Sequence, residues 1–597
     1  MSSAVVKALV AARQKCLTED EAYWDPKPDF TRPVSARNEA AALSWLLDHQ
    51  AVVCRGGPAD VAELQALCTS YCIRMGAAAP PEQASSGQRE GPAANMAAEA
   101  AAEAAAGPAN GAGSEVTAAG TDPTASSSGR SFDDSSVEAV LQRWCIQRGV
   151  RGAVSPALFA GGNGGGDGAP PDKGGPLPLR GLRADTPVTP GDVVLHVPSD
   201  LLISYETARE SDLGKVLSAL PLGLSDDSIA LIWTCVERKE PEAVHTPFWA
   251  ALPDRFSTGL SASDAEMALL EGTPLYAEAM QARKHLRDAF ESSSPAFRSL
   301  MGAYPDYFKP EWFSWESYLW AAELWYSYGI QVQLSNGNIC TCLAPYLGLM
   351  NHHPLPHIVH FSKVDPQTGC LRVRAFRSCA PGCQLFLSYG PYSNAKLLLF
   401  YGFALKDNPA DEVDLVLQVP SGPTATDRRA VLAAAGLPLE QRLRAGGRIA
   451  PAVLACARLL AAPPEILKQL RRVPPSELKA RLAAPGSTEA EAEAMRMLVD
   501  AIDALLCPAR ECARRLQMAE GDKANLTSDS TQRQDAAAAP PSLGSERVSL
   551  ATGTDGDGRV GAELRHFARL YVDGLIQILE DSRAAVSRAM EMAGACA

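Results

Sequence analysis

The sequence predicts an α+β protein in which a β-rich body is interrupted by helices and followed by a helical domain. Alternating apolar residues and turn signals at 182–203 and 330–417 favour short strands. The stretch between them, 205–325, and the stretch from 424 onward place apolar residues at helical spacing. This pattern defines a fold class, and a fold class alone does not define a function.

The N-terminal part of the chain combines helical patches with low-complexity sequence. Residues 1–75 contain short amphipathic patches, and we assign them to a helical segment. Residues 76–131 are almost entirely Ala, Gly, Pro, Ser, Glu and Thr, and such a composition buries too little apolar surface to offset the entropy of ordering. A disordered linker is therefore predicted there, with structure resuming in an amphipathic helix after Ser136.

The first β-rich stretch is preceded by a second flexible insert. Residues 161–175 read GGNGGGDGAPPDKGG and are predicted to be flexible. Strands are expected around Leu195, with a turn at Pro190-Gly191. The helical stretch 205–325 ends in the aromatic-rich sequence FSWESYLWAAELWYSY.

Strands and then helices complete the chain. Short strands are expected in CLRVRAF, QLFLSYG and DEVDLVLQV, all before residue 417. Residues 424–517 are expected to be helical, with breaks at Pro463-Pro464 and Pro474-Pro475. A polar, disordered insert is predicted at about 519–560. The closing helix, to residue 593, has an apolar stripe made of Leu564, Phe567, Tyr571, Leu575 and Ile578.

Composition excludes several classes of protein. The 597 residues carry 55 Lys and Arg against 69 Asp and Glu, and the net charge of −14 disfavours non-specific nucleic-acid binding. Apolar runs fall short of the ~20 residues that a membrane span needs, so no membrane contact is predicted. The 15 cysteines are odd in number and scattered, which favours a reducing compartment over a disulfide framework.

Unusual residues are concentrated between 340 and 402. Five cysteines and four histidines lie there, but their C-x-C and C-x₃-C spacings differ from the paired C-x₂-C of structural zinc sites, so no metal is predicted. Neither a G-x-S-x-G elbow nor a GK[ST] phosphate loop is present in the sequence. Asn351-His352 and the pairs Tyr389-Gly390 and Tyr401-Gly402 remain, and each alone is typical of a packed core.

Taken together and in order, these motifs resemble a family. The matching text includes Trp144-Cys145, GLRA at 181–184, GDVVLHVPSDLLIS at 191–204, LAPYLGLMNH at 343–352, LSYGPYSNAKLLLFYGFAL at 387–405 and DNPADEV at 407–413. The run resembles a SET-domain methyltransferase of the subgroup that contains the Rubisco large-subunit lysine methyltransferase and the actin-histidine methyltransferase. From 424 onward the chain resembles the substrate-binding domain that follows SET in this subgroup.

The resemblance implies a fold and an activity. It implies a β-rich pseudoknotted SET domain at 136–417, with a helical insertion at about 205–325, followed by an all-α substrate-binding domain at 424–593. It implies S-adenosylmethionine as cofactor and a protein-lysine N-methyltransferase that acts on a non-histone protein. Protein-histidine N-methylation and a catalytically inactive SET-like binding module remain as alternatives.

The resemblance also implies roles for single residues. Tyr389 and Tyr401 would be catalytic, Phe403 and Tyr328 would line the substrate channel, and the cofactor would be bound by Arg180, Gly181, Asn351, His352 and Tyr389. Three positions depart from the pattern: Leu179 stands where many members have Gly, Tyr328 where the Rubisco enzyme has a cofactor-binding Arg, and Gly348 where Asp is common. Our hypothesis is that Arg180 replaces the missing cation.

Partners and compartment complete the predictions. By the resemblance, the C-terminal helical domain docks a protein substrate, and we expect a monomer that binds neither nucleic acid nor membrane. The first 18 residues contain Lys and Arg but no acid, which is only a weak match to a transit peptide. A cytoplasmic or nuclear protein is expected, with the chloroplast as the alternative.

Overall fold

The computed structural model describes residues 3–15, 129–159, 179–305, 308–359, 363–534 and 556–595. Helix α1 (Ser3–Lys15) is the described part of the predicted helical segment 1–75. The predicted linker lies outside the described residues except for 129–131, where strand β1 (Arg130–Ser131) pairs with β2 (Val154–Phe159). The predicted Gly-rich insert 161–175 lies outside them as well.

Short strands build the body of the SET-like region in three sheets. The largest has the order β1-β2-β3-β11-β8, where β3 is Leu179–Ala184, β11 is Gln384–Leu387 and β8 is Asn351–His352. The other two sheets contain β4 (Val193–Pro198), β10 (Cys370–Arg374) and β9 (Val364–Asp365), and β5 (Ile203–Ser204), β7 (Ile339–Leu343) and β6 (Gly329–Gln333). Because β8 pairs with β11 in parallel, segments more than thirty residues apart in the chain come together at one edge.

Helices precede and interrupt these sheets, as predicted. Helix α7 (Val137–Gln147) follows β1. The insertion contains α8 (Tyr205–Glu210), α9 (Asp212–Ala219), α10 (Asp226–Glu237), α11 (Thr246–Ala251), α12 (Asp264–Leu269), α13 (Pro274–Ala303) and α14 (Trp315–Tyr328). Ser225, Thr273 and Ser314 cap α10, α13 and α14 through their side-chain oxygens, which explains where these helices begin.

The C-terminal region is helical, and the α+β class is confirmed. Its helices are α16 (Ala425–Ala435), α17 (Pro451–Ala461), α18 (Pro464–Leu470), α19 (Pro475–Ala483), α20 (Thr488–Gln534) and α21 (Gly556–Ala595). Pro464 and Pro475 begin α18 and α19, because proline is tolerated where a helix N–H has no partner. The region also contains a two-stranded sheet, β12 (Glu412–Val416) with β13 (Glu440–Arg444), which the sequence did not predict as part of it.

The predicted disordered insert at 519–560 differs from the structure at both of its ends. Helix α20 continues to Gln534 and α21 starts at Gly556, so the residues between 534 and 556 are the ones that lie outside the described part. The sequence between 519 and 534 is polar, and polarity alone does not separate an exposed helix from a disordered segment.

Two large hydrophobic cores organise the described residues. One core packs the sheets against α7, α8 to α11 and α14. The second joins the insertion to the C-terminal helices, because Leu260 and Leu275 of the insertion pack with Leu506 of α20 and Leu575 of α21. Strand β12 belongs to this second core, so the predicted SET boundary at 417 does not separate two cores.

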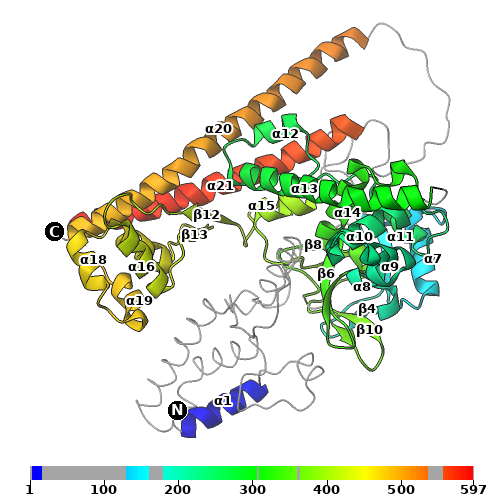
Figure 1. The fold of residues 1–597 in the computed structure, drawn as a ribbon, viewed down its shortest axis with the longest axis horizontal. Helices are drawn as coiled ribbons and strands as arrows, with labels where there is room; N and C mark the ends of the chain where they lie inside the picture. Colours follow the sequence, from blue (N-terminus) through cyan, green and yellow to red (C-terminus); the bar gives the residue numbers. More distant parts are fainter. Residues whose placement is uncertain are drawn as a thin grey trace.

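The long helices α20 and α21 connect the two ends of the molecule. They lie side by side, with α16, α18 and α19 at one end and the SET-like body at the other (Figure 1). The predicted stripe of α21 is buried at Leu564, Tyr571, Leu575 and Ile578. Among the described residues, no helix combines the length and the apolar character that crossing a membrane requires.

Candidate active site

The parallel pairing of β8 with β11 assembles the centre of the candidate site. It sets Asn351 beside Phe386 and His352 beside Leu387. The backbone N–H of Tyr389 donates to His352 Nδ1 at 3.0 Å, and the Tyr389 hydroxyl donates to the Met350 carbonyl at 3.1 Å. Tyr389 is therefore bound to the 350–352 segment through both its main chain and its side chain.

His352 is neutral at physiological pH. Its side chain is buried, and this burial, together with the nearby charge of His353, lowers its pKa to about 4. Since Nδ1 accepts a hydrogen bond from Tyr389, the neutral ring carries its proton on Nε2. The histidine thus serves as an acceptor that orients the backbone of Tyr389.

Four aromatic side chains form what we call the aromatic cluster: Tyr389, Tyr392, Tyr401 and Phe403. Tyr401 stacks on Tyr389 at a centroid distance of 5.0 Å and on Tyr392 at 5.9 Å. Phe403 lies edge-on to Tyr389 and Tyr401, at 6.3 and 6.4 Å. Burial raises the pKa of both the Tyr389 and the Tyr401 phenols, so the hydroxyls stay protonated and neutral.

Gly181 and Asn351 meet at the side of β3. The Asn351 amide donates to the Arg180 carbonyl at 2.6 Å. A Cβ atom at position 181 would lie 3.0 Å from Asn351 Nδ2 and even closer to the Gln384 side chain, at 2.2 Å. A side chain at position 181 would therefore have to displace the Gln384 amide, and the structure brings two predicted cofactor residues together.

The Arg180 side chain makes structural contacts. Its guanidinium donates to buried Glu138 of α7 at 3.1 Å and to the Ala251 carbonyl at 2.6 Å. The arginine thereby links α7 to the end of α11. The guanidinium therefore already has two partners within the protein. The role of Arg180 as a substitute cation for the cofactor carboxylate stays a prediction.

The two departures Tyr328 and Gly348 face each other. A Cβ atom at 348 would lie 3.0 Å from Tyr328 Cδ1, so the tyrosine ring occupies the space that a side chain at 348 would need. Tyr328 is also near enough to Tyr389 to contribute to the raised pKa of its phenol, after burial. Tyr328 therefore lies beside the predicted site, and the two departures compensate for each other in volume.

Sequence reasoning missed a buried network beneath the aromatic cluster. Asn394 begins the short helix α15 (Asn394–Lys396), and its side chain accepts from the Leu405 N–H and donates to the Leu405 carbonyl, both at 2.9 Å. Asp411 accepts from the Asn394 N–H at 2.8 Å and from Asn394 Nδ2 at 3.0 Å. Asn408 donates to the Tyr392 carbonyl at 2.9 Å.

This network closes the loop that carries Tyr401 and Phe403. Its residues belong to two runs that carry the family resemblance, 387–405 and 407–413, to which the sequence analysis gave no role at these positions. The residue types were a usable signal, because buried asparagine and aspartate are rare unless they are hydrogen-bonded. In the part of the chain that the structure describes, no three His, Cys, Asp or Glu side chains converge as metal ligands would.

Comparisons with known proteins agree with this arrangement. A family model for the SET domain matches residues 179–390, and a model described as Rubisco LSMT substrate-binding matches residues 419–544. SET domain-containing protein 4 of Mus musculus is 28% identical over 237 residues, which cover 38% of this chain and 53% of that protein. Actin-histidine N-methyltransferase of Homo sapiens is 26% identical over 274 residues, which cover 43% of each chain. The chain thus spans about half the length of the curated relatives it matches.

Solved structures share the fold. The crystal structure of the SET domain of LSMT bound to lysine and AdoHcy aligns with a TM-score of 0.55 over 76% of this chain and 92% of that one, at 16% identity. The structure of Rubisco LSMT bound to AdoMet aligns with a TM-score of 0.51 at 17% identity. At such identity the likeness establishes the fold alone.

Proposed function

We propose that this chain, a SET-domain protein that carries a Rubisco LSMT substrate-binding domain, is an S-adenosylmethionine-dependent N-methyltransferase acting on a lysine of a non-histone protein. One observation carries the proposal. The β8–β11 pairing brings Asn351 and His352 to Tyr389 of the aromatic cluster, although almost forty residues separate them in the chain.

The residues around β8 fit this cofactor. Gly181 leaves no side chain between β3 and Asn351, and an aromatic environment such as that of the cluster suits a positively charged centre. When bound, S-adenosylmethionine supplies a sulfonium methyl group to a nucleophile. Gly181, Asn351 and His352 would hold it, and the contacts of Tyr389 with the 350–352 segment would keep the phenol at a set position relative to it.

The aromatic cluster suits a lysine acceptor. The amine must be neutral to attack, whereas a free lysine has a pKa of about 10.4. Burial among aromatic rings favours the neutral form. The Tyr389 hydroxyl donates to the Met350 carbonyl, so its oxygen lone pairs can accept from the amine N–H and orient the attacking lone pair. Such positioning is the main source of acceleration for a displacement of this kind.

A histidine acceptor is the second candidate, because a curated relative that shares 26% identity is an actin-histidine N-methyltransferase. Imidazole has a pKa of about 6.5 and needs no large shift to be neutral. The two acceptors therefore predict different behaviour at low pH. Transfer to lysine would fall steeply below neutrality, and transfer to histidine would persist to about pH 6.5.

The test is calorimetric titration of the full chain with S-adenosylhomocysteine. We expect Asn351→Ala to abolish binding and Tyr389→Phe, which keeps the ring and removes only the hydroxyl, to largely retain it. Asn338→Ala, at an exposed asparagine in the β6–β7 turn, is the matched control and should bind as the parent does.

Binding would justify a search for methylated proteins with isotope-labelled S-adenosylmethionine and mass spectrometry, which also identifies the modified side chain. No binding to the parent chain at millimolar ligand would contradict the proposal and leave the inactive binding module as the better description.

A further inference from the structure

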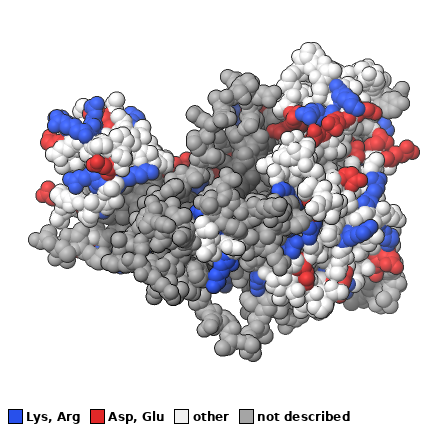
Figure 2. Space-filling model, turned by 90° about the horizontal axis from the view of Figure 1, so that it is seen from below, with Lys and Arg blue, Asp and Glu red and all other residues white. Residues whose placement is uncertain are grey.

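The region 425–486, which we call the basic lobe, differs in charge from the rest of the chain. It comprises α16, β13, α17, α18 and α19. The lobe contains eleven Lys or Arg and four Asp or Glu, a net charge of +7 in a chain whose net charge is −14. The remainder of the chain therefore carries −21. Figure 2 shows Lys and Arg side chains on the surface of the lobe, at the left of the view, interspersed with acidic ones.

Many of these cations are exposed and uncompensated. Arg471 pairs with Asp427, Arg444 with Glu412, and Arg458 with Glu491. Within the described residues, a second set is exposed and makes no ion pair: Arg429, Arg448, Lys468, Arg472, Lys479 and Arg481. Because the paired charges cancel locally, these six unpaired cations give the surface of the lobe a positive electrostatic potential.

Helix stability accounts for only part of this set. Lys468 and Arg481 lie in the last turns of α18 and α19, where a cation favours the helix dipole. Arg429 lies in the first half of α16, and Arg448 and Arg472 lie in loops that precede α17 and α19. Arg472 also directly follows the C-cap of α18, where a cation favours the helix dipole, so a different role is needed for Arg429 and Arg448.

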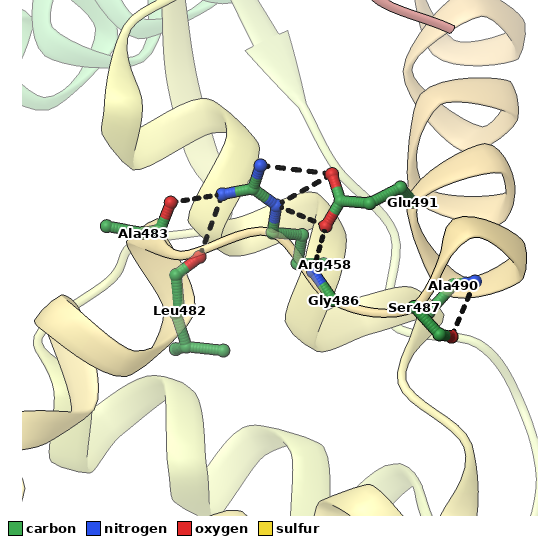
Figure 3. A network of polar contacts seen from close by, with 7 residues as sticks. All are labelled: Arg458, Leu482, Ala483, Gly486, Ser487, Ala490 and Glu491. Carbon is green, nitrogen blue, oxygen red and sulfur yellow. Dashed lines mark hydrogen bonds and ion pairs between the residues drawn. The ribbon is translucent and has the colours of Figure 1, made fainter. Parts of the chain in front are cut away.

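Buried hydrogen bonds hold the helices of the lobe in fixed positions. Arg458 of α17 donates to both carboxylate oxygens of Glu491 on α20, at 2.8 to 3.1 Å, and to the carbonyls of Leu482 and Ala483 at the end of α19 (Figure 3). The Gly486 N–H also donates to Glu491, at 2.6 Å. Since Arg458 and Glu491 are largely buried, this network fixes α17, α19 and α20 to one another. A fixed frame lowers the ordering cost of binding a charged partner.

The chemistry of the lobe favours a protein partner over a nucleic acid. Residues 425–486 contain no Phe, Trp or Tyr, so the lobe has no ring on which a base could stack. The −21 on the rest of the chain repels a long polyanion that extends beyond the lobe, whereas a short acidic segment can stay within it. We propose that the basic lobe docks an acidic segment of the protein substrate. This inference deepens the proposed function and rests on it for the identity of the partner as the methyl acceptor.

The experiment measures binding of labelled probes to the full chain by fluorescence anisotropy. The probes are a 20-residue poly-glutamate, a 20-residue poly-lysine and a 20-nucleotide single-stranded DNA. The lobe variant combines Arg429→Glu, Arg448→Glu and Arg472→Glu. The matched control makes the same change in net charge on the SET-like body, with Lys215→Glu, Lys239→Glu and Arg298→Glu, all exposed.

We expect the lobe variant to bind poly-glutamate at least tenfold more weakly than the parent, with a shallower salt dependence, and the control variant to stay within twofold. Equal weakening in both variants, or no binding of poly-glutamate to the parent, would overturn the inference. Tighter binding of DNA than of poly-glutamate would assign the surface to nucleic acid instead. If the lobe variant misfolds, the glutamine versions of the same positions repeat the test.

Titration with S-adenosylhomocysteine separates this inference from the proposed function. The lobe variant should bind it as the parent does, because the reversed charges lie outside the candidate active site. A parent that binds poly-glutamate through the lobe but not S-adenosylhomocysteine would leave the acidic docking surface in place and contradict the methyltransferase proposal.

Discussion

Asn394 shows how one polar residue can determine the position of several aromatic ones. Its buried side chain accepts a hydrogen bond from the Leu405 N–H and donates to the Leu405 carbonyl and to Asp411. Gly574 of α21 packs against Asp411 without a side chain in between. Replacement by alanine leaves the Leu405 N–H and carbonyl without these partners in a buried place. We expect Asn394→Ala to lower the free energy of unfolding by about 3 kcal/mol, measured by chemical denaturation.

The control for this change is Asn338→Ala, an exposed asparagine whose loss should cost less than about 0.5 kcal/mol. Asn394→Ala should also retain affinity for S-adenosylhomocysteine, since Asn351 and His352 lie on a different element. A loss of stability no greater than that of Asn338→Ala would show that the network does not hold the loop.

Glu323 of α14 should make the free energy of unfolding depend on pH. Burial raises its pKa to about 7, although hydrogen bonds with Ser261 and Thr258 oppose the rise. Between its ordinary pKa and the raised one, the folded state binds more protons than the unfolded state. The stability that Glu323 contributes is therefore complete below about pH 4.5 and is lost as the pH rises through 7, a change of about 3 kcal/mol.

We expect Glu323→Gln to remove this dependence. The free energy of unfolding of the parent minus that of Glu323→Gln should fall by about 3 kcal/mol between pH 4.5 and pH 8, measured by denaturant titration at each pH. Glu311→Gln, at an exposed glutamate just before α14, is the control that removes one carboxylate from the surface. A difference for Glu323→Gln that does not change with pH would contradict the raised pKa.

At the scale of elements, the π-helix Leu397–Tyr401 ends where the chain turns toward Phe403. Gly402 follows it with φ of 77°, and a Cβ atom there would lie 2.5 Å from the Ser257 carbonyl oxygen. The end of the helix therefore needs glycine for its backbone conformation and for its close approach to the insertion.

Gly402→Ala separates these two needs when it is compared with Gly337→Ala. Gly337 has a similar φ of 88° but nothing within 4 Å of its Cβ position. Both changes carry the strain of a positive φ, and Gly402→Ala alone adds the clash. We expect Gly402→Ala to be the more destabilising by about 2 kcal/mol in chemical denaturation. Equal losses would mean that Ser257 moves aside freely.

At the scale of the whole molecule, the shared second core predicts that the SET-like body depends on the C-terminal helices. Leu275 of the insertion packs in this core, and its N–H donates to the Tyr571 hydroxyl of α21 at 3.3 Å. A chain truncated after residue 418 would expose this apolar surface to water. We expect the truncated chain to aggregate and to bind a hydrophobic dye, unlike the full chain.

Size-exclusion chromatography and dye fluorescence at matched concentrations check this expectation. A monomeric truncated chain that unfolds cooperatively and binds S-adenosylhomocysteine would show that the SET-like body is independent of the second core.

Much of the architecture could be predicted from local patterns. The alternation around Leu195 predicted β4, the proline pairs predicted the breaks at which α18 and α19 begin, and the apolar stripe of α21 is buried at four of its five positions. The end of α20 differed from the prediction, because polar composition does not distinguish an exposed helix from a disordered segment.

The sequence by itself determined the order of strands and helices and the motifs that identify the family, because periodicity, capping and turns depend on residues within a few positions of one another. The tertiary structure alone decided that Tyr328 covers Gly348, that Arg180 binds Glu138, and that the insertion and the C-terminal helices share one core. These contacts join residues twenty to three hundred positions apart. Such pairs are set by the path of the folded chain and by the packing of its core, and no local pattern encodes them.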